Sequence, residues 1–108
     1  MQLCLLTLLA VSLASASFSC GANRFQNELA SYFVNADCYS RYNQFNSCCR
    51  AHDRCYEQQK GRKRCDDAVC SCMATAGQGT LCVADAAAFC MIVRKFGQSH
   101  YDAAGNHG

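Results

Sequence analysis

The sequence predicts a small all-α domain that is cross-linked by disulfide bonds. The chain has 108 residues, of which 11 are Cys and none is Pro or Trp. A domain of this size buries too little apolar surface to be comfortably stable on its core alone, and dense cysteines are typical of a disulfide scaffold in an oxidising compartment. Several segments carry apolar residues at helical spacing, and none shows convincing strand alternation. A short hairpin within residues 35–46 is the one β element that the pattern leaves open.

The N-terminal residues have the pattern of a secretory signal peptide. Residues 3–13 form an almost unbroken apolar run, and Ala14-Ser15-Ala16 is a small-x-small cleavage signal. The run is shorter than the roughly 20 residues that a bilayer-spanning helix needs. We therefore expect a signal peptide at residues 1–16 and a secreted, extracellular domain at residues 17–108. Cleavage would also remove Cys4 and leave an even number of cysteines, all of which could pair.

The first helix of the domain is expected at residues 23–33. Phe25, Leu29, Tyr32 and Phe33 recur there at helical spacing, so they would form one apolar stripe that we assign to the core. The polar, aperiodic stretch that follows is expected to be a loop carrying Cys38.

The remaining helices are expected to be separated by short turns. Asn46 or Ser47 can cap the start of the next helix, Gly61 lies within a basic turn, and Gly77 is well placed to end the helix after it. The expected helices are residues 48–59, 65–76 and 81–96, with turns at 60–64 and 78–80 and a frayed tail at 102–108.

A matching pair of cysteine spacings predicts how two of these helices pack. Cys48 and Cys55 lie on one helix face two turns apart, and Cys65 and Cys72 repeat that spacing on the next helix. If the helices are antiparallel, the register allows Cys48 to pair with Cys72 and Cys55 with Cys65. Two such bridges would fix both the distance between the helices and their rotation.

The ladder would present a group of chemically active side chains. Cys49, His52, Asp53 and Tyr56 form a stripe beside the bridged face, and Asp66 follows a bridged cysteine on the facing helix. An imidazole held by a carboxylate through one nitrogen can accept a proton from water with the other. A second carboxylate nearby, Asp53, could hold Ca²⁺, which prefers oxygen ligands.

Two other interpretations of these residues stay open. His52 and Asp53 could be ordinary solvated helix residues paired with Arg50 or Arg54. A zinc site is the second alternative, although oxidised cysteines in a secreted chain do not supply thiolates. Its ligands would be drawn from His52, His100, His107, Cys70 and Cys72.

Charge and motifs exclude some function classes. The formal net charge is only +2, with no interleaving of basic and aromatic residues, so nucleic acid is not an expected partner. A serine hydrolase is excluded because the chain has no G-x-S-x-G motif. The dense basic cluster is most often just solvated, but it could also meet anionic lipid headgroups. It consists of Lys60, Arg62, Lys63 and Arg64.

The stretch Cys48-Cys49-Arg50-Ala51-His52-Asp53-Arg54-Cys55 resembles the CCxxHDxC signature of secreted phospholipase A2 enzymes. Tyr56 follows the signature, as is common in that family. Cys65-Asp66 with Cys72 is similar to the pattern of the family's second long helix. The resemblance covers residues 38–73 well and the rest of the chain in outline.

The resemblance implies a fold, a reaction and a site. The expected fold is two antiparallel, disulfide-linked helices with N-terminal and C-terminal helices. His52 would be the base that activates water, Asp66 its orienting partner and Asp53 a bidentate Ca²⁺ ligand. The reaction would hydrolyse the sn-2 ester of a glycerophospholipid at a membrane surface or aggregate. The comparison implies the same two ladder bridges and adds Cys38–Cys49, while Cys20, Cys70, Cys82 and Cys90 stay unassigned.

One departure from the family bears directly on activity. The family's Gly-rich calcium loop should precede the signature helix, but residues 37–45 contain no Gly. Such loops need backbone conformations that other residues resist, and loss of an oxyanion donor typically costs about 10²–10³-fold in rate. Two functions follow: a Ca²⁺-dependent hydrolase with a rebuilt loop, or an inactive lipid-binding, receptor-binding or toxin-like module of the same fold.

Overall fold

The computed structural model describes residues 19–21 and 23–106, and this part of the chain is helical without any strand. The expected all-α, disulfide-rich fold is therefore confirmed. The predicted signal peptide at residues 1–16 lies outside the described residues. In chain order the elements are α2 (Arg24–Cys38), the 3-10 helix η1 (Tyr39–Arg41), α3 (Tyr42–Glu57), α4 (Arg62–Gly77), α5 (Cys82–Phe96) and α6 (Gln98–Ala104).

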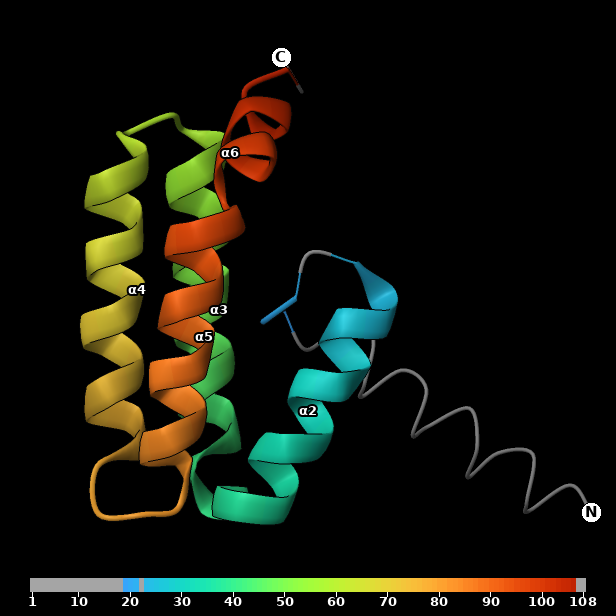
Figure 1. The fold of residues 1–108 in the computed structure, drawn as a ribbon, viewed down its shortest axis with the longest axis vertical. Helices are drawn as coiled ribbons and strands as arrows, with labels where there is room; N and C mark the ends of the chain where they lie inside the picture. The colour runs from blue at the N-terminus through green and yellow to red at the C-terminus, as the bar shows by residue number, and fades with distance from the viewer. Residues whose placement is uncertain (1–18, 22, 107–108) are drawn as a thin grey trace, which may run out of the picture.

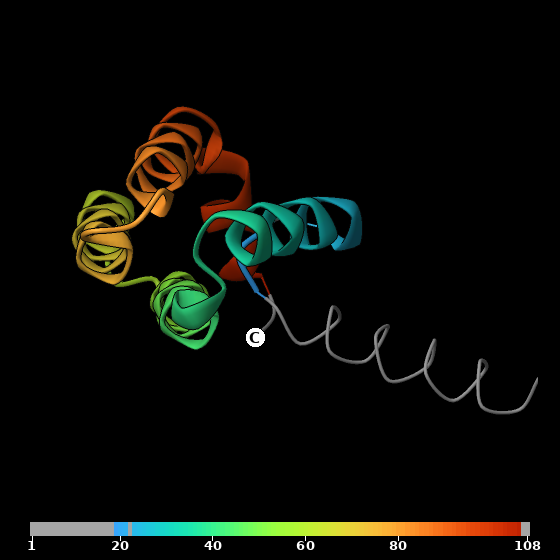
Figure 2. The ribbon, with the colours of Figure 1, turned by 90° about the horizontal axis from the view of Figure 1, so that it is seen from below.

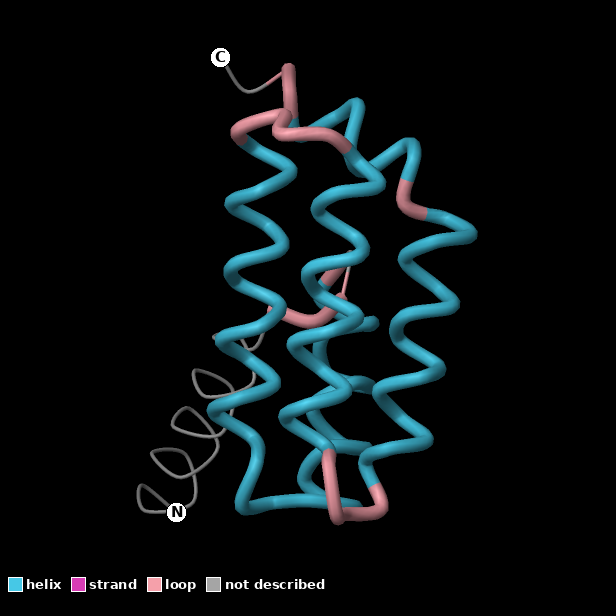
Figure 3. Tube along the Cα trace, turned by 90° about the vertical axis from the view of Figure 1, so that its left-hand side faces the viewer, coloured by secondary structure: helices cyan, strands magenta, loops and turns pink. Residues whose placement is uncertain are grey.

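The three long helices α3, α4 and α5 run side by side, each antiparallel to the next (Figure 1). Viewed end on, α4 lies between α3 and α5, and α2 crosses beside the group at an angle (Figure 2). The short helix α6 folds back at the end of α5 and contacts α3 as well. Tight loops connect the long helices (Figure 3). Because α6 contacts α3, it lies close to the α3–α4 turn.

No described helix combines the length and the apolar character that crossing a bilayer would require.

Five disulfide bonds connect these elements. Two of them, Cys48–Cys72 and Cys55–Cys65, join α3 to α4 in the register that the cysteine spacing predicts, with Cα–Cα distances of 5.6 and 5.7 Å. This number of bridges fits an oxidising, extracellular environment. The other pairs are Cys20–Cys49, Cys38–Cys82 and Cys70–Cys90.

The pairing of Cys38 with Cys49, implied by the family resemblance, is wrong. Cys38 is the last residue of α2 and bonds to Cys82, the first residue of α5. Cys49 instead bonds to Cys20, in the segment that precedes α2. The bridges therefore fasten α2 at its end to α5, and the chain before it to α3.

The loop expected at residues 35–46 is also wrong, because α2 continues to Cys38 and α3 already begins at Tyr42. Phe45, inside that stretch, is fully buried and packs edge-on against Phe89 of α5, with 6.5 Å between ring centroids. Burial of an aromatic side chain from a helical segment outweighs the low apolar content of the surrounding residues. The hairpin that the pattern left open does not form.

The apolar stripe on α2 does not form the core, contrary to the sequence-based assignment. Phe25 and Tyr32 are 72% and 67% exposed, and Leu29 and Phe33 also face solvent. The buried face of α2 instead carries small residues, which allow close packing against α3 and α5. They are Ala30, Ser31, Val34 and Cys38.

The C-terminal tail is more ordered than expected. Asp102 was expected in a frayed segment, but it lies within α6. Gln98 donates to its carboxylate across one helical turn. The ring of Tyr101 packs against Tyr56 of α3, which holds α6 over the end of the bundle. Residues 107–108 lie outside the described part of the chain.

Candidate active site

His52 on α3 and Asp66 on α4 meet across the helix pair. Asp66 directly follows Cys65, whose bond to Cys55 fixes the two helices at this level. The Nε2 atom of His52 lies 2.8 Å from Oδ1 of Asp66, and the two side chains are 10% and 4% exposed. The structure thus brings together the imidazole and the carboxylate that the sequence analysis proposed as a catalytic pair.

The hydrogen bonds of Asp66 define the state of the imidazole. An ionised carboxylate can only accept, so Nε2 of His52 carries the proton and donates it to Asp66. In the neutral tautomer that this contact favours, the other ring nitrogen, Nδ1, carries the lone pair. That is the arrangement required of a general base that removes a proton from water.

Tyr56 completes the network around Asp66. Its hydroxyl donates to the same Oδ1 atom at 2.6 Å, and its ring lies 4.2 Å from that of His52 between centroids. Burial raises the pKa of Tyr56 above its ordinary value, the hydrogen bond and charge of Asp66 raise it further, and Arg62 partly offsets them. The phenol therefore stays protonated and remains a donor throughout the neutral range.

Residues from the C-terminal half of the chain contact Asp66 or pack against Tyr56. Arg62, the first residue of α4, has its Nε atom 3.4 Å from Oδ2 of Asp66. Gly97, between α5 and α6, is buried so close to Tyr56 that an added Cβ would lie 2.5 Å from the Tyr56 hydroxyl. Tyr101 packs edge-on against the Tyr56 ring at 5.1 Å and accepts a hydrogen bond from the Gly61 amide.

Asp53, the predicted calcium ligand, lies exposed on the same helix as His52. Its pKa is raised to about 6, chiefly because the surrounding protein removes it from water and also because Glu57 repels its charge, while Arg54 partly opposes the shift. The side chain keeps much of its accessible surface, so only part of the carboxyl is shielded. Asp53 is not among the residues that hold the His52–Asp66 pair.

Asp53 does not belong to a group of metal-ligating side chains in the described part of the chain. Ca²⁺ takes six to eight oxygen ligands, often including backbone carbonyls. Here residues 37–45, where the resemblance places a calcium loop, belong to α2, η1 and α3. No cluster of three or more His, Cys, Asp or Glu side chains suited to a metal occurs among residues 19–21 and 23–106.

The alternative interpretations fare differently in the structure. His52 is not a solvated residue paired with a neighbouring arginine, because it bonds to Asp66. The zinc site loses its thiolates, since Cys70 and Cys72 are both oxidised in bridges. In the basic cluster, Lys63 pairs with Asp67 at 2.8 Å.

The sequence predicts that His52 and Asp66 lie together, as they do in the structure, but it does not predict most of the residues that contact them. Tyr56 was placed on the correct stripe without a role. Arg62 was assigned only to a basic turn, although its position four residues before Asp66 is the spacing of a helical ion pair and could have revealed it. Nothing in the local sequence marks Gly97 or Tyr101, since their contacts depend on how α6 folds back.

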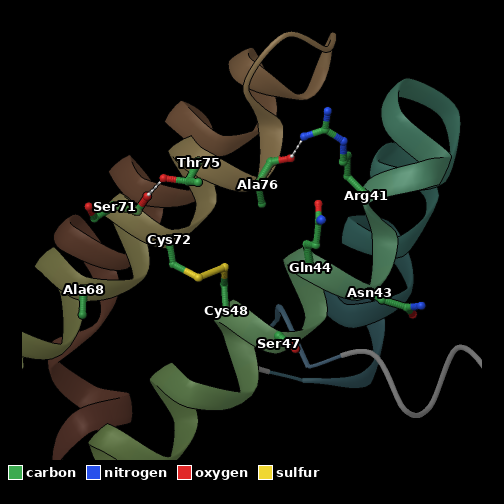
Figure 4. Close-up of a pocket in the computed structure, with 10 residues that line it drawn as sticks. All are labelled: Arg41, Asn43, Gln44, Ser47, Cys48, Ala68, Ser71, Cys72, Thr75 and Ala76. Carbon is green, nitrogen blue, oxygen red and sulfur yellow. Dashed lines mark hydrogen bonds between the residues drawn. A yellow bond between two sulfur atoms is a disulfide. The ribbon is translucent and has the colours of Figure 1, made fainter.

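A separate hollow lies between the start of α3 and the end of α4 (Figure 4). The Cys48–Cys72 bridge crosses it, and Arg41 donates from its rim to the Ala76 carbonyl at 3.1 Å. Most of its other lining side chains are small or polar, among them Ser47 and Ser71. His52 does not line this hollow.

A comparison with known proteins finds a similarity over most of the chain. Over 93 residues the chain is 38% identical to a phospholipase A2-like protein of Caenorhabditis elegans. The match covers 84% of this chain and 53% of that protein, so the chain spans about half the length of the curated relative it matches. No protein-family model and no solved structure matches the chain. The similarity supports a phospholipase A2-like family.

Proposed function

We propose that this chain is a secreted phospholipase A2-like hydrolase that cleaves the sn-2 ester of glycerophospholipids. The observation that carries the proposal is the hydrogen bond of 2.8 Å between His52 Nε2 and Asp66 Oδ1. The similarity to a protein named phospholipase A2-like supports the same class. The five disulfide bonds support secretion, because such bonds persist outside the reducing cytosol.

In this reaction His52 acts as the base. Its Nδ1 takes a proton from a water molecule while the water oxygen forms a bond to the ester carbonyl carbon. Asp66 stabilises the imidazolium that results. The proton then passes from Nδ1 to the leaving alkoxide as the bond from the carbonyl carbon to that oxygen breaks. The products are a free fatty acid and a lysophospholipid.

Calcium binding at Asp53 stays a prediction. Among the described residues this carboxylate does not belong to a group of three or more His, Cys, Asp or Glu side chains, so further Ca²⁺ ligands would be backbone or amide oxygens or water. Hydrolysis with and without Ca²⁺ separates a cation-dependent reaction from one that His52 and Asp66 support alone.

A phospholipid surface is the proposed partner, and α2 offers the supporting feature. Phe25, Leu29, Tyr32 and Phe33 are exposed on this helix, and aromatic and aliphatic side chains of a surface helix can enter the headgroup region. The chain contains no Trp, so we expect weak binding to zwitterionic vesicles and stronger binding when anionic lipid is added.

The test is an assay of oxidised residues 17–108 on mixed anionic and zwitterionic vesicles, in Ca²⁺ or in chelator. We expect release of fatty acid that is abolished in His52→Gln. His100→Gln is the matched control, since His100 is exposed on α6 and has no part in the network. Equal hydrolysis by both variants would refute the assigned role of His52.

The alternative is a catalytically inactive module of the same fold that binds lipid or a receptor. Absence of hydrolysis by a helical, fully oxidised wild type would select it. Vesicle binding by that inactive protein would then identify lipid as its ligand.

A further inference from the structure

Arg62 connects the buried carboxylate of Asp66 to the end of α5. It is the first residue of α4 and lies one helical turn before Asp66, with its Nε atom 3.4 Å from Asp66 Oδ2. The other guanidinium nitrogens bind elsewhere. One donates to the backbone carbonyls of Val93 and Arg94, and the other to the side-chain oxygen of Gln98 at 3.3 Å.

The two oxygens of Asp66 have different surroundings. Oδ1 accepts from both His52 and Tyr56, whereas Oδ2 faces the Arg62 guanidinium. Nε of Arg62 is buried and makes no hydrogen bond with the described residues, so its interaction with Oδ2 is one of charge. A carboxylate that is only 4% exposed needs such compensation, because burial of an unpaired charge is costly.

Since Val93, Arg94 and Gln98 fix the other nitrogens, the Arg62 side chain has a defined position rather than a choice of rotamers. Its charge is therefore held at one side of Asp66 while His52 and Tyr56 hold the other. Exposed Arg50 and Arg54 lie on α3 and have no such contact with Asp66.

We infer that Arg62 is a positioning residue for the His52–Asp66 pair, which it anchors to the C-terminal end of α5. It acts on the reaction through Asp66, by keeping the carboxylate plane oriented so that His52 retains a single ring orientation. The kinetic part of this inference rests on the proposed hydrolase function, whereas the orientation of the pair is measurable in an inactive protein.

The kinetic test compares Arg62→Gln with Arg62→Lys. Arg62→Gln is expected to lower kcat by about tenfold to a hundredfold with little change in KM, because misorientation of a catalytic group affects the chemical step. Arg62→Lys keeps a charge beside Asp66 but cannot reach all the carbonyls at once. Its kcat should therefore fall between that of the wild type and that of Arg62→Gln. Arg64→Gln removes the same charge from an exposed position on α4 and is the matched control.

The second test is spectroscopic and does not depend on turnover. In ¹H–¹⁵N spectra of the imidazole groups, the Nε2 proton of His52 should be protected from exchange, because it is bonded to Asp66 and the side chain is 10% exposed. Its absence in His52→Gln would assign the signal. We expect it to broaden or disappear in Arg62→Gln and to persist in Arg62→Lys and Arg64→Gln.

The two measurements separate the two proposals. An inactive wild type whose protected His52 proton is lost only in Arg62→Gln would overturn the hydrolase function and support the positioning role. If the Arg62→Gln and Arg64→Gln variants had the same kcat and the same His52 signal, the positioning role would be overturned. The role would also be overturned if both Arg62 variants kept the His52 signal and lost the same unfolding free energy. That result would indicate that Arg62 makes a structural contact only.

Discussion

Asp66 shows how polar contacts hold a single residue of this protein in place. It is almost fully buried, yet it accepts from His52 and Tyr56 and lies beside Arg62. A buried carboxylate is tolerated only when its partners replace water, so each partner contributes to stability as well as to orientation. Removing one donor should therefore be measurable in the free energy of unfolding.

Tyr56→Phe tests this directly. The change deletes a hydroxyl that donates to Asp66 at 2.6 Å and leaves the ring packing in place. Hydrogen bonds to charged groups contribute about 1.5–3 kcal/mol, so we expect a loss of that size in denaturant unfolding with disulfides intact. Tyr32→Phe is the control, because Tyr32 is 67% exposed. Equal stability of the two variants would contradict the contribution assigned to the Tyr56–Asp66 bond.

Asp85 is a second residue whose surroundings predict a measurable effect. Burial, a hydrogen bond with Asp37 and the charge of Asp37 together raise its pKa to about 6, with burial the largest cause. Its Oδ2 atom is buried without a hydrogen-bond partner among the described residues. Because its pKa in the folded state lies above the ordinary value of 3.8, the folded protein binds more protons in the interval between them. Stability should therefore fall as pH rises through that interval and then level off.

Asp85→Asn should remove this dependence on pH. The amide cannot ionise and can still donate to Asp37, so the variant should gain on the order of 1 kcal/mol over the wild type near neutral pH. Near pH 4, where the wild-type carboxyl is protonated in the folded state, the gain should vanish. Urea unfolding at the two pH values measures both. Asp102→Asn, which changes an exposed carboxyl on α6, should show no such crossover.

At the scale of elements, the sequence predicted the helices of the bundle better than the segment before it. The spacing of Cys48, Cys55, Cys65 and Cys72 was sufficient to place α3 against α4 in the correct register, because a helical face repeats with a fixed period. The lack of an apolar pattern in residues 35–46 predicts a loop, whereas the structure has helix there. The absence of Gly and Pro between Gly21 and Gly61 could have predicted continuous helix.

The candidate site was predictable only in its local part. His52 and Asp66 follow from the signature and the cysteine ladder, both of which are short-range patterns. The contacts of Arg62 and Tyr101 depend on where α5 ends and α6 turns back. That turn depends on tertiary packing around Gly97, which no periodicity in the sequence reveals.

Gly97 should therefore be intolerant of a side chain. An added Cβ would lie 2.4 Å from the Val93 carbonyl and 2.5 Å from the Tyr56 hydroxyl. At least the Val93 contact is with backbone, which cannot rotate away, so Gly97→Ala should lower the unfolding free energy by about 1–3 kcal/mol. Ser99→Ala, an exposed change on the neighbouring helix α6, is the control for helix propensity. A neutral Gly97→Ala would show that the α5–α6 joint does not press on Tyr56.

In the whole molecule, the disulfide bonds divide the chain into a rigid bundle and an attached helix. Four bridges join α3, α4 and α5 to one another or to the chain before α2, and one of them, Cys55–Cys65, closes the α3–α4 turn beside the site. Only Cys38–Cys82 joins α2 itself to the bundle. Because α2 buries mainly small side chains against the bundle and exposes Phe25 and Leu29, we expect this bridge to add substantially to the packing that holds α2 there.

Loss of Cys38–Cys82 should therefore loosen α2 while leaving the His52–Asp66 pair intact. We expect Cys38→Ala/Cys82→Ala to lose about 2–4 kcal/mol of unfolding free energy, with faster amide hydrogen exchange along α2 and an unchanged His52 Nε2 proton signal. Cys55→Ala/Cys65→Ala, which opens a bridge beside Asp66, should do the reverse: exchange should rise at the α3–α4 turn and the His52 signal should weaken. Faster exchange at the α3–α4 turn in the first variant would contradict the division into bundle and attached helix. An unaltered His52 signal in the second variant would mean that packing, rather than the local bridge, positions the pair.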